Sequence, residues 1–352
     1  MVTTATETLE SVRNYYGSVL QGTKDLKSGA CCSSESLPAH LQSIVADIDD
    51  EILDKFYGCG SPIPPALEGC TVLDLGCGTG RDVYMVSKLV GESGKVIGVD
   101  MTEAQLEVAR RHQTSQALRF GFSRSNVDFR TGYIEDLAAL GIADNSVDVV
   151  ISNCVLNLSP DKRRVFSEIF RVLKPGGELY FSDVFAGRRV PQSLSGDPIL
   201  RGECLGGAMY TEDFRRLLRD LGVLDFRVFS SRRSAINNPE IEAKTGNIEF
   251  YSRTIRAFKL DLEDICEDYG QVAYYLGGIP ESPFRFALDD HHLFFQGKPM
   301  LVCGNTAAMV SQTRFGRYFK IAGDTSVHHG PFPCGAPAPA ADEAKGCTSG
   351  CC

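Results

Sequence analysis

Apolar residues in the first seventy positions recur at the three- and four-residue spacing of helices. Two stretches carry this pattern, 7–20 and 40–56. Between them lies a Gly- and Ser-containing loop with a cysteine doublet, Cys31 and Cys32. Glycines and prolines after Tyr57 end the second helix. We therefore expect residues 1–70 to form a helical segment that carries a mobile cysteine loop.

From residue 71 to about 230 the pattern changes to short apolar runs that alternate with amphipathic stretches. Strands are predicted at 71–75, 95–100, 127–131, 147–153, 178–183 and 225–230, and helices near 81–90, 103–117, 161–173 and 211–221. Alternating strands and helices favour a mainly parallel sheet with helices on both faces. The predicted fold class is α/β, a doubly wound, Rossmann-like domain over 71–230.

The pattern beyond residue 230 is weaker. Strand-like stretches at 250–258 and 293–302, with a Gly277-Gly278 turn between them, predict a small α+β C-terminal domain over 231–322. From 323 to 352 the chain is rich in Pro, Ala, Gly and Cys and poor in apolar bulk. We expect this Cys-rich tail to be disordered.

Composition narrows the function classes. Thirty-six Lys and Arg against forty-five Asp and Glu give a net charge of −9, which argues against nucleic acid or an anionic membrane as partner. No apolar run is long enough to span a membrane, and the N-terminus has no secretory signal, so we expect a cytoplasmic protein. Thirteen cysteines in such a chain indicate thiol chemistry or the binding of a soft ion.

The strongest local signal is a glycine-rich turn after the first predicted strand. The run from Asp74 to Arg81 places glycines at Gly76, Gly78 and Gly80, directly before a helix. Glycines let the main chain approach a ligand closely and take positive φ. The next strand ends in Asp100, where an acid is placed to bind ribose hydroxyls. The sequence therefore predicts a nucleotide site.

Three cysteines far apart in sequence are expected to meet. Cys154 follows the fourth strand at its carboxyl end, Cys204 lies among glycines after the fifth, and Cys59 sits in a Gly-Cys-Gly turn before the first. Ligands of open α/β sheets bind beyond the carboxyl ends of the strands. Each cysteine alone could be a small buried apolar residue, although the glycines beside Cys59 and the strand-end position of Cys154 argue against that interpretation.

The remaining cysteines of the body are interpreted as structural. Cys77 shapes the glycine-rich turn, and Cys70, Cys266 and Cys303 lie in or beside apolar runs. For the tail cysteines, a solvated tail with incidental thiols is the simpler interpretation, and capture of a soft ion is the alternative.

The turn spacing, G-x-G-x-G after Asp-Leu, resembles the S-adenosylmethionine loop of class I methyltransferases. Further motifs make the chain similar to the arsenite S-adenosylmethionine methyltransferase family, of the eukaryotic type, over about residues 10–322. These motifs are Tyr57-Gly58-Cys59-Gly60, Gly132-Tyr133-Ile134-Glu135, Ser152-Asn153-Cys154-Val155 and Gly202-Glu203-Cys204-Leu205-Gly206-Gly207.

This resemblance implies S-adenosylmethionine as cofactor, no permanently bound metal, and As(III) as substrate bound to Cys154 and Cys204, with Cys59 as a further ligand or redox thiol. It also implies a fourth thiol in the N-terminal loop, for which Cys31 and Cys32 are both candidates. The residues it assigns to the cofactor are Tyr57, Asp74, Gly76, Cys77, Gly78, Gly80, Arg81, Asp100, Met101, Ile134, Glu135, Asn153 and Val155.

The chemistry suits these residues. Arsenic(III) is soft and prefers thiolates, and its lone pair can attack a sulfonium methyl without a general base. The resemblance further implies a thiol conjugate of As(III), such as that of glutathione, as the substrate, and thioredoxin or glutathione as reductant. Two other functions remain open: a class I methyltransferase acting on another small molecule, and a metalloid-binding protein without turnover.

Overall fold

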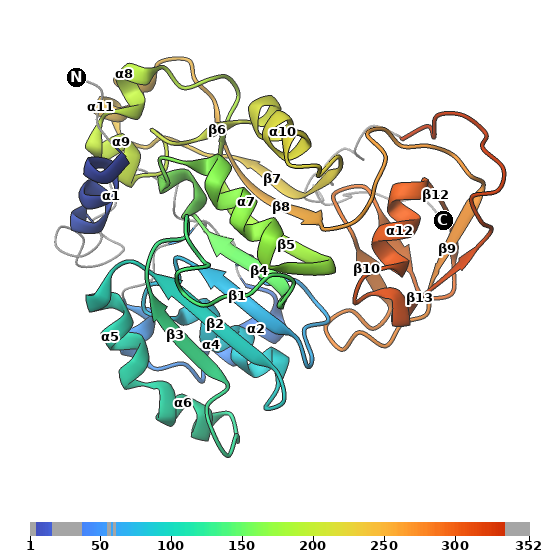
Figure 1. Ribbon diagram of the computed structural model, residues 1–352, viewed down its shortest axis with the longest axis horizontal. Helices are drawn as coiled ribbons and strands as arrows, with labels where there is room; N and C mark the ends of the chain where they lie inside the picture. The colour runs from blue at the N-terminus through green and yellow to red at the C-terminus, as the bar shows by residue number, and fades with distance from the viewer. Residues whose placement is uncertain (1–4, 16–36, 55–57, 59–60, 335–352) are drawn as a thin grey trace, which may run out of the picture.

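A computed structural model describes residues 5–15, 37–54, 58 and 61–334. Its main sheet has the order β3-β2-β1-β4-β5-β8-β7, with β6 paired to β5 (Figure 1). Strands β1 to β5 run parallel, whereas β8 is antiparallel to both β5 and β7. The strands are β1 (Thr71–Leu75), β2 (Lys95–Asp100), β3 (Val127–Thr131), β4 (Val147–Asn153), β5 (Leu173–Ala186), β6 (Met209–Tyr210), β7 (Phe226–Arg233) and β8 (Phe250–Phe258). The predicted Rossmann-like, mainly parallel fold is confirmed.

Both faces of this sheet are buried, which explains the continuous apolar runs of its strands. Leu73 and Val150 point to the side of α7 (Lys162–Val172) and α10 (Thr211–Asp220). Their neighbours Val72 and Val149 pack on the other side, under α2 (Ala39–Val45), α4 (Arg81–Val90) and α5 (Glu103–Arg111). Successive residues of a strand point to opposite faces, so one strand contributes side chains to the hydrophobic cores on both sides of the sheet.

The chain order reverses between β1 and β4. Strand β1 is the neighbour of both β2 and β4, so the connection after β1 leads to one side and later connections lead to the other. Such a switch point leaves a crevice beyond the carboxyl ends of the two strands. The glycine-rich turn follows β1 and Cys154 follows β4.

Two predicted helices are each divided in the structure. The stretch 40–56 forms α2 and the short α3 (Asp50–Leu53), because the carboxylate of Asp49 accepts the Glu51 amide and starts a new helix. The stretch 103–117 forms α5 and α6 (Gln113–Arg119), which meet at His112. The side chain of His112 lies 2.7 Å from Glu51, so the second break faces the first.

The first helix lies apart from its neighbours in sequence. Helix α1 (Ala5–Asn14) packs beside α9 (Pro198–Gly202), near α8 (Gln192–Ser195) and α11 (Pro239–Thr245), whereas α2 packs against α4 (Figure 1). The helix predicted over 7–20 is described as far as Asn14, and residues 16–20 lie outside the described residues.

The C-terminal part builds its own small sheets. A three-stranded sheet has the order β12-β9-β13, and β10 pairs with β11. Their bounds, with the helix packed on them, are β9 (Gln271–Tyr275), β10 (Arg285–Ala287), β11 (Leu293–Phe295), β12 (Pro299–Val302), α12 (Gly304–Ser311) and β13 (Phe319–Ala322). The single stretch predicted at 293–302 is therefore two strands, and Gly297 between them has a φ of +74°.

Two expectations about this region differ from the structure. The strand at 250–258, expected in the C-terminal domain, lies in the main sheet as β8, because its partners β5 and β7 are distant in sequence. Residues 323–334, expected to begin the disordered tail, have a described course, in which Pro331 forms an isolated bridge with Glu267. The rest of the predicted tail, 335–352, lies outside the described residues.

A buried ion pair joins the C-terminal part to the main sheet. The guanidinium of Arg256 on β8 lies 2.6 Å from the Glu178 carboxylate on β5, and Arg314 lies 2.5 Å from its other oxygen. Arg256 also donates to the main-chain carbonyl of Leu288 over 2.6 Å. Both Glu178 and Arg256 are fully buried, so removing Glu178 leaves the charge of Arg256 without compensation.

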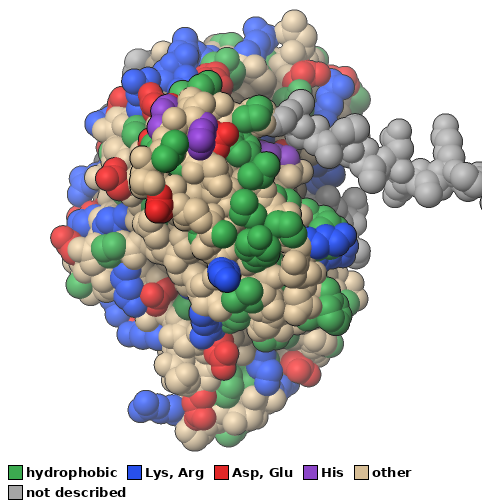
Figure 2. All heavy atoms as spheres, turned by 90° about the vertical axis from the view of Figure 1, so that its right-hand side faces the viewer, with side chains coloured by type: hydrophobic (Ala, Val, Ile, Leu, Met, Phe, Trp, Pro, Cys, Tyr) green, Lys and Arg blue, Asp and Glu red, His purple; other side chains and the backbone are tan. Residues whose placement is uncertain are grey.

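The C-terminal part also carries most of the exposed large apolar side chains of the described chain, among them Phe284, Leu301 and Val327. Figure 2 looks onto that side of the molecule and shows hydrophobic side chains gathered on it. None of the described helices is long and apolar enough to cross a membrane.

Candidate functional site

A cleft opens at the switch point of the main sheet. It encloses about 980 Å³ of space between atoms, part of it open to solvent. Its walls come from the ends of β1, β2, β3 and β4 and from α1. The lining residues are Leu9, Val12, Asp74, Gly76, Cys77, Gly78, Thr79, Asp82, Asp100, Met101, Thr102, Gln105, Gly132, Tyr133, Ile134, Glu135, Asn153, Cys154, Val155, Leu158 and Ser159.

Two glycines of the turn serve different needs. Gly76 has a φ of +73°, and a Cβ there would lie 2.4 Å from the Val155 side chain, so close packing against the loop after β4 requires glycine. Gly78 has a φ of +52°, but its missing side chain would meet nothing closer than Gln105 at 4.0 Å. The open face at Gly78 therefore belongs to the cleft.

Three carboxylates give the cleft its electrostatic character. Asp74, Asp82 and Asp100 all line it. Burial raises the pKa of Asp74 well above its usual value, and the charges of Asp82 and Asp100 raise it further. The carboxylate of Asp100 accepts the amides of Gly78 (2.9 Å) and Thr102 (2.8 Å), which ties the turn to the second strand. A cationic ligand would relieve the repulsion among these acids.

Most of the predicted cofactor residues meet here, and two do not. Gly80 begins α4 with a φ of +88° and packs on Phe129, whereas the guanidinium of Arg81 binds Asp82 at 2.7 Å. Neither lines the cleft. Tyr57 lies outside the described residues. The predicted residues that line it are Asp74, Gly76, Cys77, Gly78, Asp100, Met101, Ile134, Glu135, Asn153 and Val155.

Asn153 links the turn to the fourth strand. Its side-chain amide donates to the second oxygen of Asp82 over 3.0 Å, while Arg81 binds the first. These contacts fix the Asp82 carboxylate at the amino end of α4. The acid is therefore positioned from two sides before any ligand arrives.

The sulfur atoms of Cys154 and Cys204 lie beside the cleft, together with the carboxylate of Asp183. Cys154 follows β4 and lines the cleft, and Cys204 follows α9. The two sulfur atoms and one oxygen of Asp183 all lie within 4.8 Å of one another. The fold thus brings together two thiol positions that are separated by 50 positions in sequence.

The main chain is strained at both cysteines. Their φ angles are +56° for Cys154 and +61° for Cys204, the left-handed region that non-glycine residues avoid. Such conformations cost on the order of 1–3 kcal/mol and gather at functional sites. The strain therefore points to a role for both residues beyond packing.

Glycines near Cys204 let its loop pack closely and bury the thiol. A Cβ on Gly207 would lie 2.0 Å from the carbonyl oxygen of Asn157, and one on Gly202 would meet the Tyr15 ring at 2.6 Å. The missing side chains let the loop close onto the rest of the site. Cys204 is fully buried and Cys154 is 5% exposed.

Asp183 and Lys162 set the charge around the two sulfur positions. Asp183 accepts both the amide and the side chain of Asn157, and burial raises its pKa to about 7. Burial lowers the pKa of Lys162 to about 8, against the charges of Asp183 and Cys204, which raise it. This interaction is mutual, so the ammonium group of Lys162 favours a thiolate at Cys204.

The two cysteines differ in oxidation state in this structure. Cys154 is disulfide-bonded, whereas Cys204 is a thiol. The predicted residues Cys31, Cys32 and Cys59 lie outside the described residues. Their place relative to the pair stays a prediction.

Helix α1 closes the cleft from the N-terminal side. Its Leu9 and Val12 line the cleft, and the hydroxyl of Tyr15 donates to buried Glu203 over 3.0 Å, next to Cys204. The amphipathic pattern of 7–20 predicts a helix but gives no sign of which surface it covers. The sequence also does not predict Asp183 and Lys162 as site residues, because only the fold places them beside Cys204.

Two family models match the chain. Residues 66–222 match a methyltransferase domain, and residues 268–345 match the arsenite methyltransferase C-terminal domain. The chain is 52% identical to the arsenite methyltransferase of Aquipseudomonas alcaligenes over 94% of this chain and 95% of that protein. It is 40% identical to the human arsenite methyltransferase over 90% of this chain and 84% of that protein.

A solved structure agrees with these relatives. The crystal structure of an arsenic(III) S-adenosylmethionine methyltransferase from Chlamydomonas reinhardtii aligns with a TM-score of 0.82 at 51% identity, covering 84% of this chain and all of that one. With its sheet order and cleft, the chain is a class I S-adenosylmethionine-dependent methyltransferase. More specifically, it belongs to the arsenite methyltransferase family. Its relatives include a bacterial and a human protein, so the likeness is not confined to eukaryotes.

Proposed function

We propose that the chain transfers a methyl group from S-adenosylmethionine to trivalent arsenic held by the thiolates of Cys154 and Cys204, with Cys59 as a further ligand or redox thiol. The observation that carries this proposal is the cluster of Cys154, Cys204 and Asp183 within 4.8 Å, at the edge of the cleft. Trivalent arsenic is a soft ion, and soft ions prefer sulfur ligands such as these two thiolates.

The residues of the cleft fit the cofactor. S-adenosylmethionine, when bound, supplies an electrophilic methyl group on a cationic sulfur. Asp74, Asp82 and Asp100 offer carboxylates that a cationic ligand stabilises, and the open face at Gly78 leaves room for close approach. Asp100 is the candidate for the ribose, as its place at the end of β2 suggests.

The cysteines hold and orient the substrate. Because Cys154 lines the cleft and Cys204 lies behind it, arsenic bound to both sulfur atoms would present its lone pair toward the cleft. Fixing the two reactants in one orientation supplies much of the acceleration in such a transfer. The nucleophile loses no proton, so the described site needs no general base.

The reductive part of the proposal draws on further thiols. Cys154 is disulfide-bonded in this structure, and arsenic binding requires its thiolate. We infer that Cys31 or Cys32, with Cys59, exchanges disulfides with Cys154, and that thioredoxin or glutathione reduces them. A thiol conjugate of As(III) would enter by exchange of thiolates. We propose a cytoplasmic location, in which such thiol reductants are present.

The test is a methyl-transfer assay with labelled S-adenosylmethionine, arsenite and a thiol reductant. Wild type and the buried-thiol control Cys70→Ser should give methylated arsenic, and Cys154→Ser and Cys204→Ser at least 100-fold less. Calorimetry should find cofactor binding unchanged in all four proteins. Undiminished transfer by Cys204→Ser would favour another small substrate, and arsenic binding without label transfer in wild type would leave a binding protein.

A further inference from the structure

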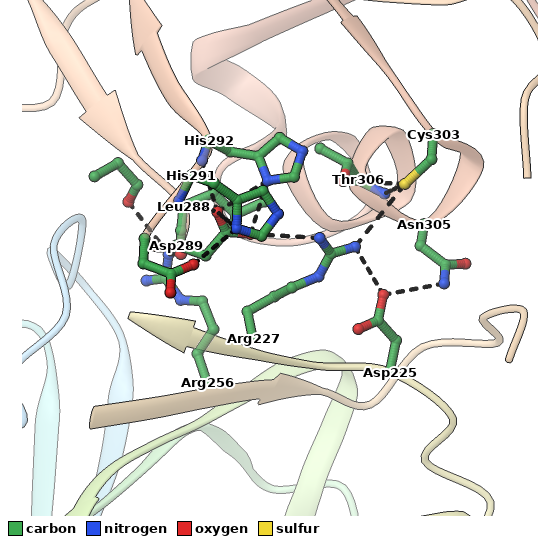
Figure 3. Close-up of polar contacts among 12 residues, drawn as sticks. Asp225, Arg227, Arg256, Leu288, Asp289, His291, His292, Cys303, Asn305 and Thr306 are labelled. Carbon is green, nitrogen blue, oxygen red and sulfur yellow. Dashed lines mark hydrogen bonds and ion pairs between the residues drawn. The ribbon is translucent and has the colours of Figure 1, made fainter. Parts of the chain in front are cut away.

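A second group of cysteines lies in the C-terminal part, outside the lining of the cleft. Cys303 directly precedes α12, and its sulfur accepts the Thr306 amide over 3.4 Å and contacts the Thr306 hydroxyl at 3.2 Å (Figure 3). The guanidinium of Arg227 on β7 reaches the same sulfur at 3.9 Å. Cys303 is fully buried, so these contacts are shielded from water.

Main-chain pairing brings two more cysteines to Cys303. The Gly304 amide donates to the carbonyl of Glu267 over 3.0 Å, which places Cys266 beside Cys303. The Phe332 amide donates to the carbonyl of Cys266 over 2.7 Å, which brings the segment of Cys334 alongside. The nearby Cys303 and Cys334 thiols, together with burial, raise the pKa of the Cys266 thiol. Cys303 is buried, Cys266 half-buried and Cys334 exposed, so the three lead from the interior to solvent.

The surroundings favour negative charge on Cys303. The hydrogen bond from Cys266, the Thr306 contacts and Arg227 together outweigh burial and lower the pKa of the Cys303 thiol to about 4. The amino end of α12 acts in the same direction. Asp225 and Asp289, at 2.7 and 3.4 Å from Arg227, share its charge (Figure 3). A thiolate poised beside a second thiol is suited to bind a soft ion.

We propose that Cys266, Cys303 and Cys334 form a second thiolate site, which takes trivalent arsenic apart from the methyl-transfer cleft. Binding exchanges bonds without electron transfer: each As–O bond of arsenious acid is replaced by an As–S bond, and each displaced hydroxide leaves as water where a thiol supplies the proton. The sequence interpretation of Cys266 and Cys303 as structural cysteines is thereby revised.

One movement is needed to complete the site. The three sulfur atoms are not all within 4.8 Å of one another, unlike the donors around Cys154. Cys334 is exposed, so it is the thiol that can move inward. Cys266 and Cys303 provide the fixed pair, and Cys334 closes the pyramid that arsenic(III) adopts with three thiolates.

Counting bound arsenic in the full-length chain tests this site independently of methyl transfer. A background variant changes Cys31, Cys32, Cys59, Cys154, Cys204, Cys347, Cys351 and Cys352 to Ser. After reduction and exposure to arsenite, one arsenic per chain should remain after desalting. Adding Cys303→Ser or Cys266→Ser should remove it, and Cys334→Ser should weaken binding at least 10-fold. The added Cys70→Ser, which removes another buried thiol, should retain it.

The choice of serine keeps the result interpretable. Serine is itself a good residue at the start of a helix, so Cys303→Ser should retain the contact to Thr306 and the melting temperature while it loses the soft ligand. In the wild-type chain, arsenite should slow the alkylation of Cys266 and Cys334 at least 10-fold, as mass spectrometry can measure. Equal arsenic content in Cys303→Ser and the background, or alkylation that arsenite does not change, would overturn the proposal.

Discussion

The thiol of Cys204 donates a hydrogen bond to the main-chain carbonyl of Cys154 over 3.2 Å. Two strained loops, one after β4 and one after α9, thus hold each other in place through the residues proposed to bind arsenic. Cys154 lines the cleft, whereas Cys204 is not among the lining residues and is fully buried. The pair is therefore positioned by the protein before the substrate arrives.

The left-handed main chain at Cys204 makes a stability prediction. Glycine takes a φ of +61° without the penalty that a Cβ causes, although it costs more entropy on folding. We expect the free energy of unfolding of Cys204→Gly to equal that of Cys204→Ala or to exceed it by about 0.5 kcal/mol. Urea denaturation of the two variants measures the difference. An alanine variant that is the more stable by 1 kcal/mol would contradict the strain at this position.

The glycine-rich turn allows a matched pair of substitutions. Gly76→Ala forces a methyl group against Val155 as well as a φ of +73°, and we expect a loss of stability of about 2–4 kcal/mol. Gly78→Ala adds similar strain in open space, so it should cost about 1–2 kcal/mol but place its methyl group in the cleft. Its affinity for S-adenosylmethionine should fall at least 10-fold. Thermal melts and calorimetry separate the two effects, and equal melting temperatures would disprove the packing argument at Gly76.

The buried pair of Glu178 and Arg256 predicts a large effect of a small change. Glu178→Gln keeps the shape of the side chain but removes the charge that compensates Arg256 and Arg314. We expect the free energy of unfolding to fall by about 3–5 kcal/mol. The exposed pair of Arg163 and Asp220, 3.3 Å apart, gives the control: Asp220→Asn should cost less than about 1 kcal/mol. Denaturant titration at pH 7 compares the variants.

Asp289 should make the protein sensitive to acid. Burial raises the pKa of its carboxyl, but the hydrogen bond to His292 and the charges of His292 and Arg227 outweigh burial and lower the pKa to about 2. A lowered pKa means that the unfolded chain takes up the proton first as pH falls, so the stabilisation is present above about pH 4 and is lost toward pH 2. Between pH 5 and pH 3 the wild type should lose about 1 kcal/mol more than Asp289→Asn. Urea unfolding at the two pH values measures this difference, and parallel losses would contradict it.

Local patterns were sufficient for much of the fold and of the cleft. The strands from 71 to 153 and the turn at Gly76 and Gly78 follow from apolar runs and glycine spacing, which act over a few residues. The break at Asp49 does not, since it depends on one carboxylate capping a new helix. The local pattern did not place strand β8 in the main sheet, because its partner β5 is far away in the sequence.

The site shows the same limit. The topology rule places Cys154 and Cys204 near the cleft, and they do lie together. Their burial could not be inferred, because the same glycines that open a loop to solvent can also let it close on a neighbour, as Gly207 does on Asn157. The cluster at Cys303 depends on main-chain contacts between segments near 266, 304 and 332, which no local pattern encodes.

The pairing of β8 with β5 limits where a truncated form of the protein can end. A truncated protein that stops near residue 230 would lose the strand that hydrogen-bonds to β5 from Glu178 to Ala186, and β7 would lose the partner that holds it to the sheet. Its exposed edge would invite other copies to pair there, so such fragments should aggregate. Expression boundaries that respect this strand must therefore extend beyond Phe258.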